Sequence, residues 1–303
     1  MNDLFPENGL RPKKRFADCV RGTTTLADGA WGTELQRLGA PLGACLDEWN
    51  LTKPELVRQV AEGYVQAGSR VILTNTFRAN RISLGGHGLE EKCAAINREG
   101  MKISRQAAGN CAMVFASIGP SGKMLVSNEV TPEQLSEAFA EQASALAAEG
   151  PDAILIETMT DIEEARIAAA AALKTQLPVV VSFVFDSGRN KDRTLMGCTP
   201  EQVASAFARD GIHAIGANCG VGVRESIAVC QRLAAACSLP VWIKPNAGLP
   251  EMVDGLPTYK TTPEEFAGFA KELREAGATF LGGCCGTTPA FIRALARHTA
   301  LVA

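Results

Sequence analysis

Three cysteines at two places in the chain could share one metal ion. Cys284 and Cys285 are adjacent, with glycines on both sides, and Cys219 ends an apolar segment and is also followed by glycine. Neighbouring side chains on a regular strand point to opposite faces, so the adjacent thiols can converge only where the backbone turns, and glycine permits such turns. Three thiolates with an open fourth position are typical of catalytic zinc. The alternative is that these cysteines only pack in the core, because free cysteine is often fully buried.

The composition limits the class of protein. The chain has 303 residues, of which 46% are hydrophobic, and a formal net charge of -3. This size can bury a large core. We expect no nucleic-acid partner, because long basic runs are missing, and no membrane span, because no stretch reaches about 18 consecutive apolar residues. The first residues lack signal-peptide features, so we expect a cytoplasmic protein whose ten cysteines are reduced thiols or metal ligands.

A short apolar strand followed by an amphipathic helix repeats along the chain. The pattern predicts eight strands, at 24–27, 70–74, 113–118, 153–156, 179–185, 214–217, 241–243 and 279–281. Eight such units predict an α/β fold with a single (β/α)8 TIM barrel over residues 23–303, with an open doubly wound sheet as the alternative. Residues 1–22 are polar, contain two prolines and show no sustained period, which predicts an N-terminal arm over one end of the barrel.

Local signals predict where several helices begin and end. Three helices are expected to start at a Thr-Pro-Glu tripeptide, at Thr131, Thr199 and Thr262. Threonine caps free N–H groups, proline suits the first turn, and glutamate complements the helix dipole. Glycines in a left-handed conformation are expected to end four helices, at Gly68, Gly150, Gly211 and Gly277.

Polar residues follow the predicted strands, at the end of the barrel where active sites form. They are Asp28, Gly29, Asn75, Glu157, Asn218, Cys219, Asn246, Cys284 and Cys285. Asn246 follows the strand between those that carry the cysteines, so its amide oxygen could occupy the open metal position. The structural alternatives are a turn residue for Asp28, an internal ion pair with arginine for Glu157, and backbone or turn contacts for Asn75 and Asn246.

Seven motifs in order along the chain resemble the zinc-dependent homocysteine S-methyltransferases, which include the homocysteine domain of cobalamin-dependent methionine synthase and the S-methylmethionine and betaine enzymes. The motifs are Asp28-Gly29-Ala30-Trp31-Gly32-Thr33, Thr74-Asn75-Thr76-Phe77, Ser117-Ile118-Gly119-Pro120, Ile156-Glu157-Thr158-Met159, Gly216-Ala217-Asn218-Cys219, Pro245-Asn246-Ala247-Gly248 and Gly282-Gly283-Cys284-Cys285-Gly286-Thr287-Thr288. The resemblance implies that Cys219, Cys284 and Cys285 bind Zn²⁺. It also implies that Asp28 and Glu157 bind the substrate ammonium, with N–H groups near Gly29 on its carboxylate.

The ligand set suits methyl transfer to a thiol. A free alkyl thiol has a pKa near 8.5 and is a poor nucleophile when protonated, whereas zinc deprotonates a bound thiol. Three thiolate ligands moderate the Lewis acidity of zinc, whereas histidine ligands would favour an activated water and hydrolysis. We therefore predict methyl transfer to homocysteine, giving methionine, with Asn75 and Asn246 as further substrate-binding residues.

The methyl donor must come from outside these residues, since the chain has no corrinoid-ligating segment. Candidates are S-methylmethionine or a similar small compound, and a methylcorrinoid on a separate protein, which the motifs at Asn75 and Asn246 slightly favour. A cationic donor would need aromatic residues, for which Trp31, Trp49, Phe77 and Tyr259 are candidates. The 186–194 loop looks longer than usual for the family and could reshape donor access.

Two other functions are compatible with parts of the sequence. The barrel could act on another thiol, as one component of a corrinoid-dependent methyl-transfer system. Lys244 in the seventh strand could instead form a Schiff base in a lyase, although that role leaves the three cysteines unexplained.

Overall fold

Eight parallel strands form a nearly closed barrel in the computed structural model, which describes residues 10–22, 24–253 and 256–300. The strands are β1 (Thr25–Leu26), β2 (Val71–Leu73), β3 (Met113–Ile118), β4 (Ala153–Met159), β5 (Val179–Phe183), β6 (Ala214–Cys219), β7 (Val241–Pro245) and β10 (Ala278–Leu281). Their order is β1-β10-β7-β6-β5-β4-β3-β2, and a parallel bridge between Ala27 and Val71 joins the two ends. The predicted (β/α)8 architecture is therefore confirmed, and the open-sheet alternative is wrong.

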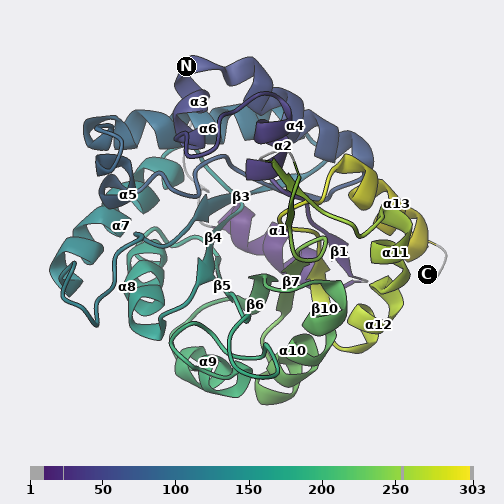
Figure 1. Cartoon of the computed structure of the whole chain (residues 1–303). Helices are drawn as coiled ribbons and strands as arrows, with labels where there is room; N and C mark the ends of the chain where they lie inside the picture. The colour runs from purple at the N-terminus through teal and green to yellow at the C-terminus, as the bar shows by residue number, and fades with distance from the viewer. Residues whose placement is uncertain (1–9, 23, 254–255, 301–303) are drawn as a thin grey trace.

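Helices surround the ring of strands (Figure 1). The longer ones are α4 (Pro54–Ala67), α6 (Cys93–Ala108), α7 (Pro132–Ala147), α8 (Ile162–Leu173), α9 (Pro200–Phe207), α10 (Val223–Ala236) and α13 (Pro289–Ala300). Two short helices, α11 (Pro263–Gly268) and α12 (Ala270–Glu275), lie between β7 and β10. The loops after β1 and β2 contain α2 (Gly32–Arg37), α3 (Trp49–Thr52), α5 (Arg81–Gly85) and the 3₁₀ turns η1 (Leu46–Glu48) and η2 (Glu90–Lys92).

The predicted helix boundaries agree with the structure. Thr131, Thr199 and Thr262 each cap a helix, and the side chain three residues later bonds back to the threonine N–H and closes a capping box. The four predicted helix-ending glycines, at 68, 150, 211 and 277, all have positive φ. Each unit of the barrel is thus delimited by local backbone chemistry.

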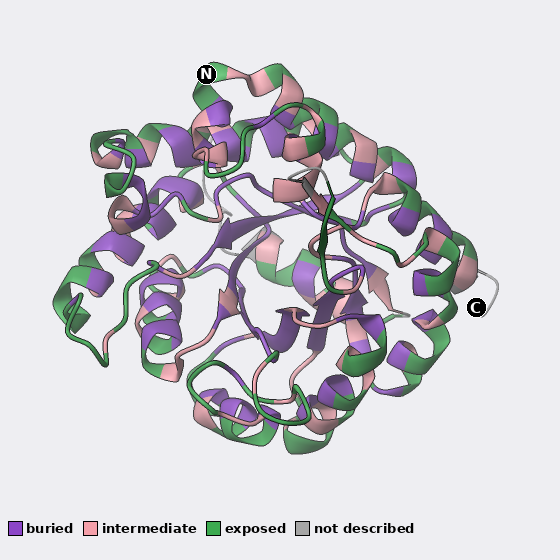
Figure 2. Ribbon diagram, viewed as in Figure 1, coloured by how far each residue is buried: buried purple, intermediate pink, exposed green. Residues whose placement is uncertain are grey.

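The barrel buries apolar side chains on both faces of its strands. The strands and the inner faces of the helices are buried, and the outer faces of the helices are exposed (Figure 2). Inside the ring, the ring centroids of Phe115 and Trp242 are 5.7 Å apart, and those of Trp242 and Phe280 are 5.2 Å apart. These large rings fill the N-terminal part of the barrel, so an open cavity can form only towards the C-terminal ends of the strands.

The described part of the predicted N-terminal arm is a helix, α1 (Leu10–Val20), which packs against the barrel. Phe16 of α1 is 4% exposed and stacks on Phe115, with ring centroids 5.8 Å apart. Arg15 forms an ion pair with Asp152 at 2.5 Å. The sequence did not predict this helix, because Phe16, Cys19 and Val20, which pack on the barrel, lie at helical spacing over too few residues to give a sustained period. Residues 1–9 lie outside the described part.

A second sheet was not predicted. Strands β8 (Glu251–Val253) and β9 (Leu256–Thr258) pair antiparallel in the segment after β7. The sequence between them, Asp254-Gly255, is a strong hairpin signal that could have revealed them.

Candidate functional site

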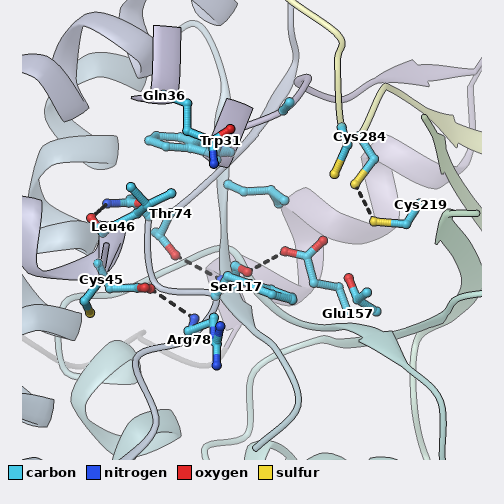
Figure 3. Close-up of a pocket in the computed structure, with 18 of the residues that line it drawn as sticks. Trp31, Gln36, Cys45, Leu46, Thr74, Arg78, Ser117, Glu157, Cys219 and Cys284 are labelled. Atoms are coloured by element: carbon cyan, nitrogen blue, oxygen red, sulfur yellow. Dashed lines mark hydrogen bonds between the residues drawn. The ribbon is translucent and has the colours of Figure 1, made fainter. Parts of the chain in front are cut away.

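A cavity of about 350 Å³ opens among the loops that follow the strands. Of the eight residues that were predicted to bind metal or substrate, six line it: Gly29, Asn75, Glu157, Cys219, Cys284 and Cys285. Asp28 and Asn246 are not among the lining residues. In Figure 3 Cys219 and Cys284 lie on one side of the cavity, whereas Cys45 and Arg78 lie on the other. The predicted residues therefore converge on one cavity, from strands far apart in the sequence.

The three cysteines meet at one end of this cavity. Their Sγ atoms all lie within 4.8 Å of one another, and those of Cys219 and Cys284 are 2.9 Å apart (Figure 3). All three are free thiols. The Cys284 N–H donates to the carbonyl of Pro245, and the carbonyl of Cys285 accepts from Ala247, so the end of β7 holds the cysteine pair. The predicted turn between the adjacent cysteines is confirmed.

A left-handed backbone and a tight contact shape the ligand loops. Cys219 has φ of 60°, a conformation that costs a non-glycine residue roughly 1–2 kcal/mol. Thr158 on β4, which lies beyond β5 from β6, has φ of 62°, and Asn218 holds it through bonds to its N–H at 2.9 Å and its hydroxyl at 2.7 Å. At Gly286 a Cβ would lie 2.2 Å from the Tyr259 ring. These contacts restrict the backbone of the loops that carry the cysteines to few conformations.

The three thiols share negative charge. Hydrogen bonds from Cys219 and Cys284 hold the pKa of Cys285 at about 3. The bond from Cys219 lowers the pKa of Cys284, but donation to Cys285 and burial outweigh it and raise that pKa to about 12. Hydrogen bonds to both neighbours, together with burial, raise the pKa of Cys219 well above its ordinary value. The cluster therefore offers one thiolate at neutral pH, ready for a cation.

The donor set fits a zinc ion. Zinc takes thiolate ligands at about 2.3 Å, so two thiolates on one tetrahedral ion lie ~3.8 Å apart. That separation falls between the 2.9 Å of Cys219 and Cys284 and the 4.8 Å limit of the cluster. Small side-chain movements would therefore admit the metal. Oδ1 of Asn246 is also buried and has no hydrogen-bond partner among the described residues, whereas its Nδ2 donates to the carbonyl of Gly220 at 2.8 Å. That this oxygen takes the fourth position stays a prediction.

The Asp28 carboxylate bonds to other residues of the chain and does not line the cavity. It is fully buried, and its Oδ1 accepts from Lys244 Nζ at 2.5 Å. Its Oδ2 accepts from Trp31 Nε1 at 2.8 Å and from the Leu73 N–H at 2.7 Å. In this structure a substrate ammonium could reach Asp28 only if Lys244 moved. Asp28 therefore forms an internal ion pair, and its contact with the substrate stays a prediction.

Glu157 is the buried acid that faces the cavity. It is 7% exposed, and its Oε1 accepts from Ser117 Oγ at 2.5 Å (Figure 3). Burial raises its pKa to about 7, although the charge of Lys244 acts in the opposite direction. Its predicted arginine partner is absent from the ion pairs of the described residues, so the structural alternative for Glu157 is not supported. Glu157 is available to a ligand.

Lys244 does not have the properties of a Schiff-base lysine. Burial lowers its pKa, but the charges of Asp28 and Glu157 outweigh burial, and the net effect raises it. A Schiff base needs a neutral amine, so the ion pair with Asp28 opposes the lyase alternative.

Comparison with characterised proteins gives the family. A family model described as homocysteine S-methyltransferase matches residues 25–299. The chain belongs to the homocysteine S-methyltransferase family. Methionine synthase from Mycobacterium tuberculosis is 28% identical over 302 residues, which cover 93% of this chain and 25% of the relative. Methionine synthase from Mycobacterium leprae is also 28% identical, over 91% of this chain and 24% of the relative. This family member spans about a quarter of the length of these relatives.

Solved structures of the family have the same architecture. The metallated form of the homocysteine methyltransferase MmuM from Escherichia coli has a TM-score of 0.78 and 25% identity, covering 94% of this chain and 99% of MmuM. The carboxyl transferase domain of Rhizobium etli pyruvate carboxylase, at 14% identity and a TM-score of 0.54, shares the fold alone. In the described residues of the homocysteine S-methyltransferase family member, no helix is long and apolar enough to cross a membrane.

Several contacts of this homocysteine S-methyltransferase family member were not foreseen. Asn75 donates to the Leu46 carbonyl at 2.8 Å and to Asn50 at 3.1 Å, so it anchors the loop after β1 while lining the cavity. Ser117 was named only as part of a motif and Lys244 only as a Schiff-base candidate, and their contacts with Glu157 and Asp28 were not predicted because both residues lie in apolar strands. A polar residue near the C-terminal end of a barrel strand was the signal that could have found them.

The expected donor features are present only in part. Of the four aromatic candidates, Trp31 and Phe77 line the cavity, and Trp49 and Tyr259 do not. The 186–194 loop contributes no residue to the lining in the described structure.

Proposed function

We propose that this protein transfers a methyl group from an external donor to the thiol of homocysteine, giving methionine. The observation that carries the proposal is the convergence of three free thiols, within 4.8 Å of one another, on a cavity that also exposes the buried acid Glu157. Family membership supports the same activity, and the relatives named methionine synthase and homocysteine methyltransferase agree with it.

Cys219, Cys284 and Cys285 would hold a zinc ion in this proposal. When bound, zinc supplies the Lewis acidity that keeps an acceptor thiol deprotonated at neutral pH. The protein contributes the negative charge of its thiolates, which keeps the acceptor sulfur electron-rich. That sulfur then forms a bond to the methyl carbon, while the bond between this carbon and the donor breaks and its electron pair leaves with the donor.

The chain orients the acceptor through Glu157. A substrate ammonium next to this carboxylate favours its ionised form, which burial otherwise opposes. The hydrogen bond from Ser117 leaves the second carboxylate oxygen for the ligand. The aromatic rings of Trp31 and Phe77 line the cavity and help to exclude water from the reacting atoms.

The donor would enter from the side of the cavity away from the cysteines. Cys45 and Arg78 line that side, so the space extends beyond the acceptor region. S-methylmethionine and a methylcorrinoid carried by a separate protein are the two donor classes that we propose to compare. Methylcobalamin can stand in for the second class in an assay.

The test combines metal content with turnover. Reduced protein should contain one zinc per chain and should form methionine from homocysteine with S-methylmethionine, betaine or methylcobalamin. The Cys284→Ser variant should lose both zinc and turnover, and Cys111→Ser, at an exposed free thiol, should keep both. A wild-type protein that binds no zinc under reducing conditions and methylates homocysteine from none of the donors would refute the proposal.

A further inference from the structure

Lys244 places a buried positive charge in the wall of the cavity. The residue belongs to β7, is 2% exposed and is one of the lining residues. Its Nζ lies 5.8 Å from the centroid of the Trp242 ring, which closes the barrel beneath it. A lysine ammonium in such a place is costly unless it has partners. A buried ammonium at the cavity is therefore a candidate for ligand binding.

Asp28 fixes Lys244 and has little capacity left for a ligand. Its two oxygens already accept three hydrogen bonds, from Lys244, Trp31 and the Leu73 N–H. Trp31 and Leu73 hold the carboxylate by its Oδ2, whereas the ion pair uses Oδ1. Asp28 therefore keeps the ammonium of Lys244 in one position.

Lys244 has hydrogen-bonding capacity that the chain does not use. An ammonium group has three N–H donors, and among the described residues Nζ makes one hydrogen bond, to Asp28. Glu157, whose charge also acts on Lys244, has a free carboxylate oxygen in the same cavity. The cavity thus presents a cation with free donors and an anion with a free acceptor, which together complement the two charges of an α-amino acid.

We propose that Lys244 binds the α-carboxylate of the acceptor thiol and that Asp28 is its positioning residue. This inference rests on the proposed function and adds the groups that select the acceptor. The ammonium of the acceptor pairs with Glu157, and its sulfur reaches the cysteine cluster. Thiols without a carboxylate leave the buried ammonium of Lys244 without its ligand, so the site disfavours them.

Three thiols separate the contacts. Homocysteine has both charged groups, 4-mercaptobutanoate lacks the ammonium, and 3-aminopropanethiol lacks the carboxylate. Their dissociation constants with zinc-loaded protein are measured by calorimetry, which requires no turnover. In Lys244→Gln we expect binding of homocysteine and of 4-mercaptobutanoate to weaken about 10- to 100-fold, because a charge-assisted bond is lost. Binding of 3-aminopropanethiol should change less than about twofold.

Variants of Asp28 and Glu157 test the same assignment of the carboxylate and ammonium contacts. Asp28→Asn should weaken the two carboxylate-bearing thiols and not 3-aminopropanethiol, a pattern that general loosening of the site would not give. Glu157→Gln should show the reverse selectivity, losing homocysteine and 3-aminopropanethiol. Lys271→Gln, at an exposed lysine on α12 paired with Glu275, is the matched control and should change none of the three constants.

The single variant at Lys244 unbalances a buried ion pair, so a second, charge-balanced variant is needed for the test. Lys244→Gln leaves Asp28 buried without its cation, which can prevent folding. The double variant Asp28→Asn with Lys244→Gln removes both charges and should show the same selective loss. Equal weakening of all three thiols, or of none, in the folded variant would overturn the assignment of Lys244 alone. If homocysteine does not bind to zinc-loaded wild-type protein, the proposed function fails, and this inference fails with it.

Discussion

Replacing Glu157 by glutamine should make the protein more stable while it loses its acceptor. Glu157 is 7% exposed, and burial raises its pKa from 4.5 to about 7 despite the opposing charge of Lys244. Glutamine has nearly the same shape, carries no charge, and keeps an oxygen that can accept the bond from Ser117. The substitution therefore removes the cost of ionising a buried acid.

The size of the effect follows from the difference in pKa. One pKa unit corresponds to about 1.36 kcal/mol, so a change from 4.5 to about 7 corresponds to about 3 kcal/mol. Between these two pH values the native state binds a proton at Glu157 that the unfolded state has released. The free energy of unfolding of the wild type therefore falls as pH rises through this range. The neutral glutamine is free of this loss, so the advantage of Glu157→Gln grows from near zero at pH 4.5 to about 3 kcal/mol above pH 7.

Urea denaturation at a series of pH values measures this difference. Reduced, zinc-free protein is used, so that only the ionisation of the chain contributes. Glu62→Gln, at an exposed position on α4, is the control and should show a flat difference from the wild type. Calorimetry on zinc-loaded protein should show weaker homocysteine binding for Glu157→Gln, which would make Glu157 a residue kept for function at the expense of stability. If Glu157→Gln is less stable than the wild type above pH 7, or if the difference does not depend on pH, the reasoning is refuted.

Three further predictions test other parts of the structure. Removal of zinc by a chelator should lower the Tm of the wild type and leave that of Cys219→Ser unchanged, because only a bound ligand stabilises by mass action; equal shifts would contradict the thiol site. Phe16→Ala should lower the free energy of unfolding by about 3–5 kcal/mol in urea denaturation, whereas Lys14→Ala, exposed on the same helix, should have little effect; similar losses in both would argue against α1 as a packed cap. Gly216→Ala should cost about 3 kcal/mol or more, because a Cβ would lie 1.9 Å from the Trp242 carbonyl oxygen, and a stable variant would show that β6 and β7 can separate.

The sequence by itself determined the barrel and most of its boundaries. All eight predicted strands are present, because apolar runs of this length between turn signals can form buried parallel strands. The capping threonines and the helix-ending glycines act within a few residues of chain, so their effect is visible without the fold. Knowing that strand ends form the reactive face was enough to select six residues of one cavity.

The tertiary structure alone decided how the charged residues pair. Asp28 and Lys244 are 216 positions apart, and no local pattern connects them. Their ion pair forms because β1 and β7 both lie next to β10 in the ring. That pair places a buried cation beside Asp28, whereas Glu157 forms no ion pair among the described residues. Strand register and ring closure determine which side chains meet in the interior. In that desolvated interior, the interaction energy of each charged pair is far larger than it would be in water.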